Sequence, residues 1–336
     1  MSHRERPGRC FEFIREVCIL KFFIADAFTD SLFGGNPAGV VIIPDEQDYP
    51  DDETMRKTAA ELRYSETAFL RRLGDQSWQA RYFTPAAEVE LCGHATIGSA
   101  YCLRESGLIG EGVCRYKTLA GDLDILVQGH SVLMDMGFPR IVQDITDPGL
   151  IGEIYSTMGL NPAGRESEAA ASALSAAFKG AAMCASESEK PASVRMLPKK
   201  VSTGLVDIML PVADEAELDA VTPDFPALSA LSERENVVGV HAFTLNSEDG
   251  NIHARNFAPL YDIDEEAATG TSNGALTFYL AGYGVIKKNV KNVVIQGEKM
   301  GRPSRIETVF STTSAGEPEV RVGGRAVILA GGDIYI

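Results

Sequence analysis

Two turns of small residues, each at the start of an apolar segment, are the part of this sequence best suited to chemistry. Gly93 and His94 open one segment, Gly270 and Thr271 open the other, and each segment ends at a glycine. Segments of this kind are typical of helices. Free N–H groups at a helix N-terminus carry partial positive charge and bind carboxylates or phosphates. One such turn would be ordinary capping, but the matched pair indicates two helix starts that bind an anion.

Glu66 is a candidate for proton transfer. It lies in the segment 65–70, which has the composition of a strand, and Phe69 and Leu70 are close to it in sequence. A carboxyl group in an apolar cleft has a raised pKa, which suits it to exchange protons near neutral pH. Composition alone favours the other interpretation, an exposed glutamate on the solvent face of a strand.

The side chains beside the two turns also have two interpretations each. In one interpretation His94 binds a substrate or relays a proton as a neutral imidazole, because a helix N-terminus disfavours the imidazolium. In the other interpretation His94 only caps the helix. In one interpretation Glu265 or Glu266 supplies a second carboxyl group across a cleft from Glu66. In the other, both only interact favourably with the helix dipole. Cys92 has no partner thiol in the second half, so we expect it to be packed and inert.

An internal repeat connects the two turns. Phe83-Thr84-Pro85 precedes the first turn and Phe257-Ala258-Pro259 precedes the second, with an acidic stretch after each. The two motifs lie 174 residues apart in a chain of 336 residues. This spacing predicts a duplicated unit, and two similar domains that face each other across a cleft, where ligands commonly bind.

Strands and helices that would carry these residues follow from the local pattern. We expect strands at 18–27, 40–43, 65–70, 80–84, 113–117, 122–128, 131–136, 204–210, 237–245 and 250–257, and again near the C-terminus. We expect helices at 51–62, 94–107, 214–220, 226–234 and about 271–282. Asn36 lies in the turn-rich loop after the first strand. Residues 163–193 are rich in Ala, Ser and Glu, and we expect them to form a mobile surface insertion.

The composition excludes several classes of protein. Apolar residues make up 45% of the chain and charged residues 23%, as in soluble globular proteins. A net charge of −16 argues against binding to nucleic acid or to anionic membranes, and the apolar runs are too short to span a bilayer. The six cysteines form no C-x-x-C pair and the five histidines lack metal-ligand spacing, so we expect no disulfide framework and no metal site. Free thiols favour a reducing, cytoplasmic compartment.

Four segments of the chain resemble signatures of one family. They are DAFTDSLFGGNPAGVVI, YSETAFL, RYFTPAAEVELCGHATIGSA and RNFAPLYDIDEEAATGTSNGAL. On these segments the sequence resembles the PhzF-like isomerases of phenazine biosynthesis, over most of the chain from about residue 20. The resemblance implies an α+β fold like that of diaminopimelate epimerase, with two pseudo-symmetric domains, each a barrel-like sheet around a central helix. The domains would span 18–140 and 141–324, and a C-terminal strand, 325–336, would return to the first.

The resemblance also implies roles for individual residues. Glu66 corresponds to the family's catalytic acid/base glutamate, and Gly93 and His94 correspond to its Gly-His pair. The family's E-D-P-A-T-G-S pattern falls on 265–271, where Glu266 replaces the aspartate and Thr271 replaces the serine. The candidate substrate contacts are therefore Asn36, Ser65, Gly93, His94, Glu266, Gly270 and Thr271.

The implied activity is isomerisation of a small carboxylated metabolite by a proton shift, without a cofactor or a metal, in a homodimer. Two other functions stay open. Related epimerases and proline racemases use one cysteine in each half, and here Cys92 stands at the first position and Thr269 at the second. A racemase, epimerase or dehydratase of the same fold would use this pair. The remaining alternative is a non-catalytic protein that binds a metabolite.

Overall fold

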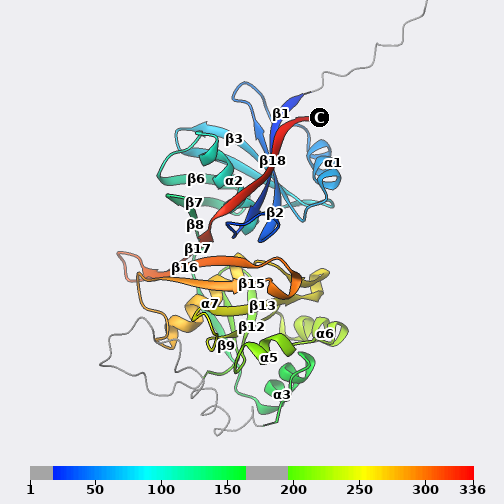
Figure 1. Cartoon of the computed structure of the whole chain (residues 1–336), viewed down its shortest axis with the longest axis vertical. Helices are drawn as coiled ribbons and strands as arrows, with labels where there is room; N and C mark the ends of the chain where they lie inside the picture. The colour runs from blue at the N-terminus through cyan, green and yellow to red at the C-terminus, as the bar shows by residue number, and fades with distance from the viewer. Residues whose placement is uncertain (1–17, 164–195) are drawn as a thin grey trace, which may run out of the picture.

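The computed structural model describes residues 18–163 and 196–336, and it shows a mixed α/β fold in two lobes (Figure 1). Within these residues the strands form one hydrogen-bonded network of 18 strands. The network curves around one long helix in each lobe, and these two helices carry the turns that the sequence singles out.

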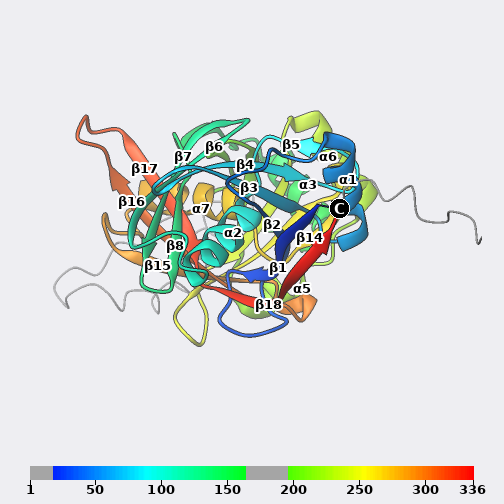
Figure 2. The ribbon, with the colours of Figure 1, turned by 90° about the horizontal axis from the view of Figure 1, so that it is seen from above.

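The first lobe encloses the helix α2. Its elements are β1 (Ile19–Ala27), β2 (Asn36–Ile43), α1 (Asp52–Leu62), β3 (Thr67–Gly74), β4 (Ser77–Phe83), β5 (Glu88–Val89), α2 (Gly93–Glu105), β6 (Gly112–Thr118), β7 (Gly121–Gln128) and β8 (Ser131–Asp135). α2 packs against β1, β2, β3 and β8, and Figure 2 shows it surrounded by strands. Small residues such as Ala95, Gly98 and Ser99 are buried, because they let the strands approach the helix on several sides.

The second lobe encloses the helix α7. Its elements are β9 (Arg140–Asp144), α3 (Pro148–Thr157), β10 (Lys199–Ser202), β11 (Val206–Pro211), α5 (Glu215–Ala220), α6 (Phe225–Glu235), β12 (Gly239–Thr244), β13 (Ile252–Ala258), the 3-10 turn η1 (Pro259–Tyr261), β14 (Ile263–Glu266), α7 (Gly270–Gly282), β15 (Lys291–Gln296), the 3-10 turn η2 (Glu298–Met300), β16 (Ser304–Thr312) and β17 (Pro318–Gly324). α7 packs against β9, β10, β11, β16 and β17.

The helices α3, α5 and α6 cover the opposite face of the second lobe. Ile154 of α3 and Leu228 of α6 share one apolar core with Ile208 and Leu210 of β11. Side chains alternate between the two faces of a strand, so Asp207 lies on the face of β11 that looks toward α7.

Strands of one lobe pair with strands of the other. β17 pairs antiparallel with β8, and the last strand, β18 (Ala326–Tyr335), returns to the first lobe and pairs antiparallel with β1 along its length. Figure 1 shows this return as the red strand beside the dark blue one. The two lobes are therefore joined by hydrogen-bonded backbone and not only by loops.

Most of the expected elements are present, with small differences at their ends. The sequence analysis missed the strands β5, β9, β10 and β14 and the helix α3. The helix α3 has ordinary start signals: Asp147 accepts a hydrogen bond from the Leu150 N–H, and Pro148 follows it. The insertion expected at 163–193 lies, after its first residue, outside the described residues. Among the helices of the described residues, none has both the length and the hydropathy to cross a membrane.

Candidate active site

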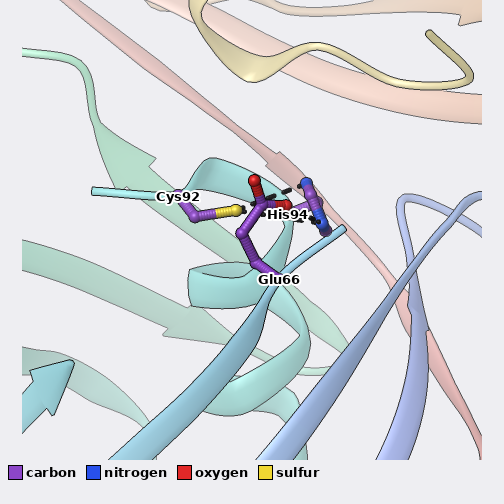
Figure 3. Close-up of side chains that lie close together, drawn as sticks. All are labelled: Glu66, Cys92 and His94. Atoms are coloured by element: carbon purple, nitrogen blue, oxygen red, sulfur yellow. Dashed lines mark hydrogen bonds and ion pairs between the residues drawn. The ribbon is translucent and has the colours of Figure 1, made fainter. Parts of the chain in front are cut away.

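Glu66 lies at the entrance to β3, between two strands that fix its backbone. Its carbonyl oxygen accepts a hydrogen bond of 3.1 Å from the Gly39 N–H of β2. A Cβ at Gly39 would lie 2.6 Å from the Thr67 hydroxyl, so this close approach of β2 and β3 requires glycine. The Glu66 side chain is 19% exposed, and its Oε2 lies 3.2 Å from His94 Nε2 (Figure 3). Glu66 is therefore not the solvent-exposed strand residue that composition alone favoured.

His94 is held in the first turn of α2 by contacts to both ring nitrogens. Its Nε2 lies 3.2 Å from the Ser65 hydroxyl as well as from Glu66, and its Nδ1 lies 3.3 Å from Asn36 Nδ2. Cys92 Sγ is 3.5 Å from Nδ1 (Figure 3). The imidazole is 5% exposed, so these neighbours, rather than water, decide its protonation.

The charges of Glu66 and His94 differ from the sequence-based prediction. Burial pushes the pKa of Glu66 upward, but the hydrogen bond and the charge of His94 outweigh burial and bring the pKa to about 2. Burial lowers the pKa of His94, but Cys92 and Glu66 together raise it well above 6.5. The expectations of a raised Glu66 pKa and of a neutral imidazole were therefore wrong. Cys92 and Glu66 together therefore raise the His94 pKa more than burial lowers it.

Glu266, from the second lobe, is a carboxyl group whose pKa is raised, whereas the pKa of Glu66 is lowered. Asn36 Nδ2 donates to Glu266 Oε1 at 3.2 Å and to the Ala268 carbonyl oxygen at 3.1 Å, and it lies 3.3 Å from His94 Nδ1, so Asn36 is placed between Glu266 and His94. Burial raises the pKa of Glu266, although His94 and the Thr269 hydroxyl counteract it. Two carboxyl groups whose environments push their pKa values apart form the usual arrangement of an acid and a base.

The starts of α2 and α7 lie against each other. A Cβ built on Gly93 would lie 3.9 Å from the Gly270 Cα. Neither N-cap residue, Cys92 or Thr269, caps its helix with a side-chain hydrogen bond. The N–H groups of both first turns therefore converge on the same region as Glu66 and His94, and they offer a place for negative charge.

The loop between β1 and β2 brings Asn36 to this centre, and the second lobe holds that loop. Gly35 has a φ of 63°, and a Cβ there would lie 2.1 Å from a backbone oxygen, so only glycine fits. Arg302 donates to the carbonyl oxygens of Gly34 and Gly35 at 2.8 and 2.9 Å, and to the buried carboxylate of Asp26 at 2.8 Å. Contacts across the lobes therefore position Asn36.

Three other residues considered from the sequence, Glu265, Thr271 and Cys92, differ in how they relate to the centre. Glu265 forms two hydrogen bonds of 2.8 Å with Arg255, so Glu266 is the acid that reaches the centre. The Thr271 carbonyl oxygen accepts a hydrogen bond of 2.8 Å from Thr203, which fixes the first turn of α7. Cys92 is 8% exposed, and burial raises the pKa of its thiol, so the thiol is neutral near pH 7.

The sequence analysis missed the residues that support Glu266. Gln296, at the end of β15, donates to the Glu266 carbonyl oxygen at 2.7 Å and to the Thr269 hydroxyl at 3.1 Å. Asn273 donates to Gln296 Oε1 at 2.7 Å. Asp207 accepts a hydrogen bond of 2.7 Å from Ser272 of α7, and burial raises the Asp207 pKa to about 6. Only the position of Asp207 inside an apolar strand gave a signal in the sequence, because Gln296 and Asn273 have no motif.

One set of ligand-type atoms could hold a metal ion at this centre. Glu66 Oε2, Cys92 Sγ and a His94 ring nitrogen lie within 4.8 Å of one another. A metal on His94 Nε2 would have to displace a proton from an imidazole whose pKa is raised, and Cys92 would have to lose the proton of a thiol whose pKa is raised. The protonation states of His94 and Cys92 therefore favour a proton-transfer site over a metal site.

Comparisons with known proteins agree on one family. The family model described as "Phenazine biosynthesis-like protein" (PhzC-PhzF) matches residues 25–332. The "Uncharacterized isomerase YddE" of Escherichia coli K12 is 30% identical over 314 residues, which cover 90% of this chain and 94% of that protein. A PhzF-family crystal structure from Bacillus anthracis has a TM-score of 0.74 at 24% identity and covers 95% of this chain and 100% of that one.

The fold also extends to epimerases. A hydroxyproline epimerase from Agrobacterium vitis has a TM-score of 0.57 at 15% identity, over 94% of this chain and 91% of that one. This likeness concerns the fold alone, whereas the family model and the relatives cover nearly the whole sequence. The chain therefore belongs to the phenazine biosynthesis-like protein family, as a PhzF-like isomerase.

Proposed function

We propose that this chain is a cofactor-independent isomerase that moves a proton between carbon atoms of a small carboxylated metabolite, with Glu66 as the acid/base. One observation carries the proposal: a shielded, ionised carboxylate, Glu66, lies where two helix starts meet, and a second carboxyl group with a raised pKa, Glu266, lies at the same centre beside Asn36. Relatives that are named isomerases support the class of reaction.

The charges define the order of the steps. Glu66 is ionised before the reaction, so it takes the proton from a substrate carbon. Its low pKa makes it a weak base but makes the protonated form a strong acid, which returns the proton readily to another carbon. The N–H groups at the starts of α2 and α7 would bind the substrate carboxylate or the charge that develops while the proton is away. No atom is gained or lost overall, which is an isomerisation.

The fold indicates which part of the chain supplies which half of the site. We extend the proposal to two pseudo-symmetric domains, 18–140 and 141–324, with 325–336 returning to the first. Enclosure of α2 and of α7 by strands, and the pairing of β18 with β1, support this division. In that arrangement each domain supplies one helix start and one carboxyl group.

Proton exchange with solvent tests the role of Glu66. The unaltered chain is incubated in D₂O with a panel of small carboxylic acids, and deuterium at carbon is measured by mass spectrometry. A compound that exchanges with the unaltered chain should exchange at least about a hundredfold more slowly with Glu66→Gln, because general acid/base catalysis contributes that much or more. The matched control is Glu61→Gln, which changes an exposed glutamate of α1. Unchanged exchange with Glu66→Gln would contradict the proposal.

A racemase or dehydratase that uses Cys92 with Thr269 is the second candidate. The contact of 3.5 Å between Cys92 Sγ and His94 Nδ1 favours it. The raised thiol pKa and the donation of the Thr269 hydroxyl to Glu266 at 2.9 Å argue against it. Cys92→Ala separates the two: it should retain exchange if Glu66 is the base and should lose it if the thiol is. A compound that binds stoichiometrically without exchange would instead indicate a non-catalytic protein.

A further inference from the structure

A cavity of about 470 Å³ lies at the seam between the lobes, and it is separate from the candidate active site in its lining residues. Its lining comes from the loop after β1, from β15 and β16, and from the connection between β17 and β18: Thr29, Asp30, Val293, Arg305, Glu307 and Arg325. None of these side chains takes part in the hydrogen bonds among Asn36, Glu66, His94 and Glu266. The volume is in the range of sites for small molecules.

The backbone brings two arginines to this cavity. The Arg305 N–H donates to the Phe28 carbonyl oxygen at 2.7 Å, and the Thr29 N–H donates to the Arg325 carbonyl oxygen at 3.2 Å. The first-lobe segment 28–29 is therefore bonded on one side to β16 and on the other to the strand connection. This arrangement fixes the places of both arginines and of Asp30 at one opening.

The two guanidinium groups have no counter-ion in the described parts of the chain, where neither Arg305 nor Arg325 makes a side-chain hydrogen bond or an ion pair. The nearest acid on β16, Glu307, is committed to Lys291 at 2.7 Å and to the Ser131 hydroxyl. Both arginines are exposed to solvent at the cavity. The two guanidinium groups therefore bring unpaired positive charge to one opening of a chain whose net charge is −16.

We propose that this cavity is a second ligand site, which binds a small oxyanionic metabolite between Arg305 and Arg325. Guanidinium groups form paired hydrogen bonds with phosphate and carboxylate oxygens, so the ligand carries a phosphate group or two carboxylates. Asp30 and Glu307 also line the cavity and repel anions, so the ligand has to contact the guanidinium groups directly to bind. Because the cavity is lined by both lobes, the bound anion would also hold the loop that leads to Asn36.

Binding of simple anions tests the proposal without any knowledge of the substrate. Inorganic phosphate and citrate are titrated into the full chain by isothermal calorimetry at constant ionic strength. One arm uses phosphate and the other uses citrate, so the two oxyanion types are told apart. Arg305→Gln with Arg325→Gln should weaken binding of the better probe by about tenfold or more, because two charged hydrogen-bond donors are removed. Arg305→Lys with Arg325→Lys should show an intermediate loss, because it keeps the charges but not the paired geometry.

The matched control is Arg63→Gln with Arg140→Gln, which removes the same charge from two exposed arginines outside the cavity and should not change binding. Glu66→Gln should also leave binding unchanged, so this proposal and the proposed function can fail separately. The proposal is overturned if neither probe binds saturably, if the Arg305/Arg325 double variant binds as the unaltered chain does, or if Asn36→Ala removes binding instead, which would place the anion at the helix starts.

Discussion

Replacing Glu66 by glutamine removes one charge of the Glu66–His94 pair, so its effect on stability should depend on pH. The pKa of Glu66 falls from 4.5 to about 2 on folding, which corresponds to about 3 kcal/mol of stability at neutral pH. The folded-state pKa is the lower one, so this stabilisation is present above pH 4.5 and is lost as the pH falls toward 2.

His94 contributes with the opposite sign. Its pKa in the folded chain is raised well above 6.5, so its stabilisation is fully present below pH 6.5 and is lost as the pH rises through the folded-state value. Glu66→Gln should remove the Glu66 contribution and the part of the His94 contribution that comes from Glu66, while the part that comes from Cys92 remains. The stability difference between the unaltered chain and Glu66→Gln should therefore be largest between pH 4.5 and pH 6.5.

Urea unfolding between about pH 3 and pH 9 measures this difference, with Glu61→Gln as the control for an exposed glutamate. NMR of the His94 ring reports its protonation directly: the ring should be protonated at neutral pH in the unaltered chain, and its pKa should be lower in Glu66→Gln. A stability difference that is the same at every pH would refute the assignment of charges. A neutral His94 ring in the unaltered chain below pH 6.5 would refute it as well.

Two further substitutions test the groups around the centre. The pKa of Asp207 is raised from 3.8 to about 6 in the folded chain, so ionisation of Asp207 should lower the stability by about 3 kcal/mol in all as the pH rises from 3.8 to 6. Asp207→Asn should abolish that pH dependence in urea unfolding. A pH profile like that of the unaltered chain would contradict the assignment. Arg302→Met leaves the Asp26 carboxylate, which is 1% exposed, without its charged partner, and it should cost about 3 kcal/mol or more in thermal or urea unfolding. Arg72→Met, whose partner Asp75 is exposed, should cost less than about 1 kcal/mol, and an equal loss in both variants would show that the Asp26 pair is not special.

The pattern along the chain was sufficient for most of the helices and strands and for the two helix starts at the centre. Helix starts at Gly93 and Gly270 follow from glycine and small residues before apolar segments, which are local properties. Strand composition placed the segments around Glu66 and the hairpins of the first lobe, because alternation and turn residues act over a few positions. The strands β14 and β9 were not predicted from the sequence, because short, exposed strands are defined by their partner strands and not by their own residues.

Ionisation of the centre was decided by the tertiary structure alone. Phe69 and Leu70 are the neighbours of Glu66 in sequence and suggested an apolar site, but the group that sets the Glu66 pKa is His94, 28 positions away along the chain and 3.2 Å away in space. Gln296 was hidden for the same reason, since its contact with Glu266 exists only after β14 and β15 fold around α7. The sequence by itself predicted the two helix starts, because secondary structure is local, and the resemblance to a family singled out Glu66 and His94. Only folding decided which of them carry charge, because electrostatic interactions depend on distance in space and on burial.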